Sequence, residues 1–239
     1  NTAQLSGNVS NSFKGIFDGD GHTISGLKIV NISKNLQNVG LFGVLDGAVV
    51  KNLAIEDASV YGYNHVGILA GQIKGESVIT DVTVEGTAAA NTSSGGYASD
   101  AAVGGLAGKI SGSSSGSRAT VENVTAIVNT VNLGATSKTG GIAGEVSNAY
   151  IVDTSVSATG NNILGRYYVG GIVGAMSSGT SIYNVSVDGT IGGNGAYAVG
   201  GITGYYEGGE IVVARMFGEI GKTNAGTARE GVFIGTRKD

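Results

Sequence analysis

The chain of 239 residues carries 14 basic and 18 acidic side chains, a formal net charge of −4, and 44 glycines without any proline, cysteine or tryptophan. The absence of cysteine excludes a disulfide framework, a thiol nucleophile and a zinc ribbon. A pI near 5.2 without a basic run argues against nucleic acid and anionic membrane surfaces as partners. No apolar run approaches ~18 residues, so we expect no membrane insertion in this segment.

Glycine at this level is typical of collagen, of disordered linkers, or of β-structure with a tight turn in every unit. Collagen is excluded because glycine does not recur at every third residue and proline is absent. Disorder is disfavoured because 41% of the residues are hydrophobic, with Val, Ile and Leu regularly placed. The first ten residues contain neither an initiator Met nor a signal-peptide core, so we interpret the chain as a fragment of a longer protein.

Residues 1–34 precede the repeats described below and are expected to form an opening coil. Within them Asp18, Asp20 and His22 could bind calcium or zinc, because two carboxylates and an imidazole lie close together in sequence. An EF-hand would need a glutamate at the twelfth position, which is Ile29 here. The alternative is a tight turn in which His22 bonds to local backbone.

A block of the form Val-Gly-Gly-(Ile/Leu)-X-Gly recurs from about residue 35 to residue 239. The last glycines of its copies are Gly43, Gly71, Gly108, Gly144, Gly174, Gly204 and Gly235. Their spacings are 28, 37, 36, 30, 30 and 31 residues. Glycine suits a corner where the next coil passes ~4.8 Å away, because it has no Cβ to clash.

A second element follows each block and alternates apolar with polar residues, as in 50–55, 79–84 and 182–187. This pattern predicts a half-buried strand, so each repeat is expected to hold a short glycine-flanked strand, a turn and a second strand. One register carries Asn or Asp in successive repeats: Asn52, Asp81, Asn123, Asp153 and Asn184, with Ala214 breaking the series. We expect these side chains to stack as a ladder or to bond to turn backbone.

Repeats of 28 to 37 residues with two or three short strands predict an all-β, single-domain parallel β-helix of about seven coils, with right-handed winding. A β-propeller is disfavoured because its blades need ~40 residues and four strands. The long intervals carry inserts at Thr87–Ala102 and Ser111–Ala119, which should be surface loops.

Tyrosines flank the glycine blocks and indicate a recognition surface. The candidate binding residues are Tyr167, Tyr168, Arg166, Tyr205 and Tyr206. Tyr and Arg are enriched at the centres of protein interfaces, although tyrosines can also pack on a neighbouring coil.

A carbohydrate-active enzyme is the remaining catalytic hypothesis. Glycoside hydrolysis needs two carboxylates ~5 to 9.5 Å apart. Asp81 and Asp153 share a register, but Asn123 separates them, so a structural polar ladder is the alternative.

The block Gly40-Leu41-Phe42-Gly43 and its copies resemble the GLUG repeat, and the leading segment Phe13–Ile24 resembles the stretch that often precedes such repeats. The late runs Val199–Gly204 and Glu230–Gly235 are similar to the N-terminal, non-catalytic part of the streptococcal immunoglobulin A1 protease-like zinc metallopeptidases. The resemblance covers nearly the whole chain and implies a secreted or cell-wall-attached, extracellular bacterial protein.

The resemblance further implies that the parent protein cleaves immunoglobulin A1 or another host glycoprotein, with this module as spacer or docking surface beside adjoining domains. No catalytic residue can be carried over, because a zincin needs His-Glu-x-x-His and neither His22 nor His65 is followed by Glu. We therefore expect no cofactor in this segment and zinc in a domain outside it. An adhesin or stalk of a non-enzymatic surface protein is the alternative function.

Overall fold

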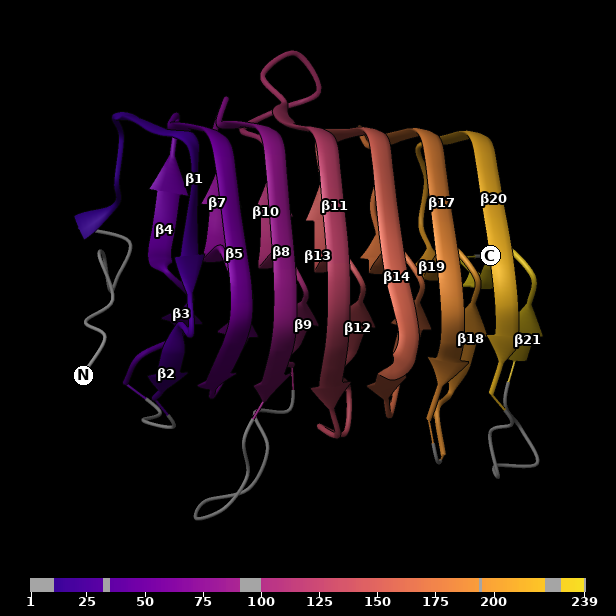
Figure 1. The fold of residues 1–239 in the computed structure, drawn as a ribbon. Coiled ribbons are helices and arrows are strands. Elements are labelled where there is room, and N and C mark those ends of the chain that lie inside the picture. Colours follow the sequence, from indigo (N-terminus) through magenta and orange to yellow (C-terminus); the bar gives the residue numbers. More distant parts are fainter. Residues whose placement is uncertain (1–10, 32–34, 91–99, 194, 222–228, 239) are drawn as a thin grey trace.

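The structure, a computed structural model, describes residues 11–31, 35–90, 100–193, 195–221 and 229–238. It is all-β, and its parallel strands form three sheets that run the length of the molecule (Figure 1). Among the described residues, no helix is long and apolar enough to cross a membrane.

The two shorter-stranded sheets are named A and C, and the long-stranded one B. Sheet C contains β3 (Asn38–Val39), β6 (His65–Val66), β9 (Ala102–Gly104), β12 (Lys138–Gly140), β15 (Tyr168–Gly170), β18 (Ala198–Gly200) and β21 (Arg229–Gly231). Sheet A contains β4 (Phe42–Asp46), β7 (Ala70–Lys74), β10 (Ala107–Ser111), β13 (Ala143–Ser147), β16 (Val173–Met176), β19 (Thr203–Tyr206) and β22 (Ile234–Arg237). Sheet B contains β1 (Ile16–Ser25), β2 (Lys28–Val30), β5 (Val49–Gly62), β8 (Val78–Ala90), β11 (Ala119–Asn132), β14 (Ala149–Gly165), β17 (Ser181–Gly192) and β20 (Glu210–Ile220).

The chain visits sheet C, then A, then B in every repeat, and each strand pairs in parallel with its counterpart one repeat later. The described residues thus form six complete coils, from β3 to β20, with β1 and β2 before them and β21 and β22 after them. The predicted parallel β-helix is confirmed, with three strands in each coil, the upper number of the two or three expected, and six complete coils among the described residues against about seven expected.

The glycine block joins sheet C to sheet A instead of flanking a single strand. A Cβ added to Gly108 would lie 2.4 Å from the backbone nitrogen of Val66, on the sheet C strand of the preceding coil. A Cβ on Gly105 would lie 2.7 Å from the core side chain of Val128. The glycines therefore allow two strands and the core to meet at one sharp corner, which no larger residue would permit.

The Asn/Asp register marks a bend inside sheet B. Asn52, Asp81, Asn123, Asp153 and Asn184 all have a positive φ of 49 to 55°. Asn and Asp adopt this left-handed conformation more readily than other side-chain-bearing residues.

The bend shifts the alternation, so that buried positions lie three apart across it, as in Val50 and Leu53, and two apart after it. The strict alternation predicted for 50–55 is wrong for this reason. In the last coil the residue equivalent to Asn184 is Val213, and the expected Ala214 is wrong. Val212 and Ala214 pair with Tyr183 and Val185, which leaves Val213 opposite Asn184. Val213 has the same positive φ, 55°.

The core lies between sheet B and sheets A and C and consists mainly of Ile, Val, Leu and Ala. Phe13 and Phe17 pack on Phe42 at the first coil, with ring centroids 5.2 and 5.5 Å away. At the other end of the stack Val232 and Phe233 are 64% and 46% exposed.

The inserts are shorter than predicted. Within Thr87–Ala102, residues 87–90 extend β8 and Ala102 begins β9, while 91–99 lie outside the described residues. Within Ser111–Ala119 the loop is 112–118, which Figure 1 shows projecting from the stack between β10 and β11.

Candidate functional site

Two rows of side chains meet outside the glycine corner, and we call the surface that they form the corner face. The sheet C row is Asn38, His65, Ala102, Lys138, Tyr168, Ala198 and Arg229, each in register with the next. The sheet A row is Val44, Gln72, Lys109, Glu145, Ala175, Tyr205 and Thr236. Because each strand alternates, these residues point away from the core that their neighbours fill.

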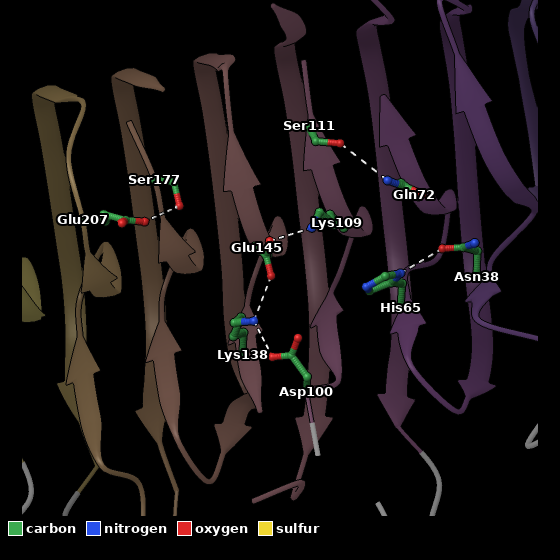
Figure 2. A network of polar contacts seen from close by, with 10 residues as sticks. All are labelled: Asn38, His65, Gln72, Asp100, Lys109, Ser111, Lys138, Glu145, Ser177 and Glu207. Atoms are coloured by element: carbon green, nitrogen blue, oxygen red, sulfur yellow. Dashed lines mark hydrogen bonds and ion pairs between the residues drawn. The ribbon is translucent and has the colours of Figure 1, made fainter. Parts of the chain in front are cut away.

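The middle of the corner face holds a network of ion pairs (Figure 2). Lys138 Nζ lies 2.9 Å from Glu145 Oε2 and 2.5 Å from Asp100 Oδ1, and Lys109 Nζ lies 2.7 Å from Glu145 Oε1. Burial opposes ionisation of Glu145, but hydrogen bonds from the two lysines outweigh it and lower its pKa to about 2. Burial likewise disfavours the charged form of Lys138, yet its carboxylate partners raise its pKa.

His65 lies beside this network and is held neutral. Its Nδ1 is 2.9 Å from the amide oxygen of Asn38 one coil earlier, as Figure 2 shows. Burial, followed by the nearby charge of Lys109, lowers the pKa of His65 to about 4.

The late coils gather four tyrosines at the corner face, which we call the tyrosine cluster. Tyr168 and Tyr205 belong to its two rows, and Tyr167 and Tyr197 each precede a residue of the sheet C row. The rings of Tyr167 and Tyr197 stack with centroids 4.9 Å apart and planes 13° apart. Those of Tyr168 and Tyr205 stack at 4.6 Å and 15°. Burial and the neighbouring phenols raise the pKa of Tyr168, so its hydroxyl stays protonated and able to donate a hydrogen bond.

The predicted binding residues are only partly brought together. Tyr167, Tyr168 and Tyr205 join, whereas Tyr206 packs against the core side of β19 and donates its hydroxyl to the carbonyl of Gly209 at 2.8 Å. Arg229 lies beside the cluster, with its Cζ 5.5 Å from the ring centroid of Tyr197. Arg166 directly precedes Tyr167 in the chain, and its backbone nitrogen donates to Ser137 Oγ at 3.4 Å.

The Asn/Asp register forms hydrogen-bonded pairs on the outer side of sheet B. Asn52 donates to Asp18 at 3.0 Å. In the same way Asn123 donates to Asp81 at 2.5 Å and Asn184 donates to Asp153 at 2.6 Å. Because Asp and Asn alternate, no two carboxylates are neighbours along this register.

The candidate metal residues Asp18, Asp20 and His22 lie within strand β1, at an irregularity in its pairing with β5 where Asp20 and Gly21 have positive φ. Asp18 Oδ1 accepts from the backbone of Asp20 at 3.0 Å, and its Oδ2 lies 3.0 Å from Lys51 Nζ. Hydrogen bonds from Asn52, Asp20 and Lys51 lower the pKa of Asp18 to about 2. His22 Nδ1 lies 3.1 Å from the carbonyl oxygen of Gly19. The described part of the chain brings no three His, Asp or Glu side chains together as a metal site.

Sequence reasoning missed the ion-pair network, Tyr197 and Arg229. A positional signal could have found them: residues two before the first glycine of each block and one after the last glycine make up the corner face. Aligning the repeats on their glycines places Lys138 and Glu145 at these two positions of one coil. The same alignment puts Tyr167 and Tyr197 at a shared position three before the first glycine.

Comparison with known proteins finds sequence similarity for part of the chain and a similar fold for most of it. No protein-family model matches the sequence. A segment of 86 residues, 36% of the chain, is 45% identical to halomucin from Haloquadratum walsbyi, of which it spans 1%. Among solved structures, a proposed immunoglobulin A1 protease from Bacteroides ovatus is similar over 93% of this chain and 68% of its own, with a TM-score of 0.59 and 22% identity. At that identity the likeness shows a related β-helix fold.

Proposed function

We propose that this chain is a non-catalytic β-helix module of a secreted or cell-wall-attached protein, and that the corner face docks a protein partner. The observation that carries the proposal is the tyrosine cluster, in which stacked rings are held on a rigid scaffold. Stacked tyrosines offer large contact area at low entropy cost, and Arg229 beside them adds the other residue type enriched at interface centres.

The ladder supports a scaffold role over a catalytic one. Asp81 and Asp153, the carboxylates that a carbohydrate-active enzyme would use, each accept a hydrogen bond from the Asn of the next coil. Such bonds hold neighbouring coils in register and occupy one oxygen of each carboxylate, and an Asn separates the two carboxylates along the register, whereas glycoside hydrolysis needs a facing pair of carboxyl groups.

We further propose that the parent protein is a zinc metallopeptidase acting on immunoglobulin A1 or another host glycoprotein, with zinc in a separate domain. The fold likeness to the Bacteroides ovatus protein supports this choice. The exposed Val232 and Phe233 at the end of the stack suit contact with an adjoining domain. The competing proposal, an adhesin or stalk, is favoured by the similarity to halomucin.

Binding to immobilised immunoglobulin A1 tests the docking role. We expect a Kd below ~100 µM and at least a tenfold loss in a Tyr168→Ala, Tyr197→Ala double variant. Tyr183→Ala is the matched control, because Tyr183 is 49% exposed but lies on sheet B. No binding by the wild-type chain up to ~100 µM would refute docking of this partner.

A further inference from the structure

A second surface, remote from the corner face, has the features of a small-ligand site. A depression of about 380 Å³ lies where sheet A passes into sheet B, and it is lined by Glu76, Val78, Tyr150 and residues 115–118. Its volume lies at the lower end of the range of small-molecule sites, ~300 to 1,000 Å³.

The loop 112–118 builds one wall of this depression. It is the longest connection from sheet A to sheet B among the described coils: the others span 47–48, 75–77, residue 148, 177–180 and 207–209. The loop closes on itself through two backbone hydrogen bonds between Ser114 and Ser117. Ser117 also donates its hydroxyl to Glu76 Oε1 at 2.6 Å, which ties the loop to the preceding coil. The wall is therefore ordered before any ligand arrives.

Arg118 is fixed in the depression by three separate contacts. Its Nε donates to the carbonyl of Ser115 at 2.9 Å, its Nη1 donates to Ser181 Oγ at 3.2 Å, and its Cζ lies 4.5 Å from the ring centroid of Tyr150. These hydrogen bonds use two of the five N–H donors of a guanidinium. Within the described structure, three N–H donors of Arg118 remain for a ligand. The side chain is already held in one conformation, so binding would cost little further conformational entropy.

The chemistry of the lining defines a class of ligand. A fixed guanidinium with spare donors suits a carboxylate, which it can bind through two hydrogen bonds. Tyr150 keeps 42% of its surface exposed despite the stacked guanidinium, so a ring face can contact it. Glu76 beside them can accept from hydroxyl groups and disfavours ligands with several negative charges, such as phosphates or strongly acidic peptides.

We propose that this depression binds the carboxylate-bearing end of an acidic saccharide. Arg118 would hold the carboxylate, Tyr150 would contact the sugar ring, and Glu76 and Ser117 would take its hydroxyls. The site is separate from the corner face, so it gives the module a second recognition function, on a different side of the β-helix.

Titration of the isotope-labelled chain by NMR tests the proposal, with two acidic saccharides, 3′-sialyllactose and trigalacturonate, as probes. Lactose and galactotriose are their neutral counterparts, and a hexapeptide of aspartate serves as the acidic peptide. We expect millimolar or tighter binding of at least one acidic saccharide, with shift changes confined to 76, 115–118 and 150. No saturation up to ~10 mM by either saccharide, equal binding of the neutral counterparts, or tighter binding of the peptide would overturn the proposal.

Variants separate recognition from folding. Arg118→Gln should weaken binding at least tenfold, since it removes charge-assisted hydrogen bonds. Arg118→Lys, which keeps the charge and lacks the fork, should weaken binding to an intermediate degree. Arg215→Gln is the matched control because Arg215, on β20 of sheet B and outside the depression, likewise uses its guanidinium to donate a hydrogen bond, from Nη1 to Asn184 at 3.2 Å. Wild-type affinity in both Arg118 variants would refute the assignment, whereas loss of corner-face docking would leave it untouched.

Discussion

Replacing Glu145 by Gln should destabilise the fold in a pH-dependent way. The ordinary pKa of 4.5 falls to about 2 in the folded chain, where the Glu145 side chain is 22% exposed and faces Lys109 and Lys138. One pKa unit corresponds to about 1.4 kcal/mol, so ionised Glu145 contributes about 3 kcal/mol near neutral pH. Because the folded pKa is the lower one, this stability is present above pH 4.5 and is lost as pH falls toward 2.

Urea unfolding followed by circular dichroism measures this contribution. The difference in free energy of unfolding between the wild type and Glu145→Gln should be about 3 kcal/mol at pH 7 and about 1 kcal/mol at pH 3. Glu122→Gln is the control, because Glu122 is exposed on sheet B and should change stability by less than ~0.5 kcal/mol. A difference that is the same at both pH values would show that Glu145 acts through packing and not through its charge.

Three further predictions concern the backbone at Val213 and Gly108 and the protonation of His65. Val213→Asn should stabilise the chain by about 1 kcal/mol in thermal or urea unfolding, because Val213 holds a φ of 55° that β-branched residues tolerate poorly; unchanged or lower stability would contradict this. Gly108→Ala should cost more than ~2 kcal/mol, since its Cβ would lie 2.4 Å from the nitrogen of Val66. The control Gly116→Ala should leave the free energy of unfolding nearly unchanged, because its Cβ would have its nearest atom at 3.9 Å. Similar losses of stability in the Gly108 and Gly116 variants would count against the tight corner. By NMR His65 should stay neutral down to pH about 4, so the stability due to its neutral ring declines between pH 6.5 and about 4; titration near pH 6.5 would show that it is not desolvated.

The repeat pattern alone determined the architecture. Glycines at spacings of 28 to 37 residues fix one coil per repeat, because a corner crossed by the next coil excludes a Cβ. The Asn/Asp register was equally visible, since a left-handed bend in five successive coils favours the residue types that adopt it most readily.

Only the tertiary structure decided which polar residues meet. Lys109 and Glu145 are 36 residues apart in sequence, and nothing local to either predicts their contact at 2.7 Å. Their meeting depends on the register of two adjacent coils in sheet A, which pairs Lys109 with Glu145.

The depression beside Arg118 likewise could not be read from the chain. It joins Glu76, a loop, Tyr150 and Ser181 from four successive coils. Repeats specify what each coil presents outward, but the stacking of coils decides which of these side chains share a site, because that depends on packing between segments far apart in sequence.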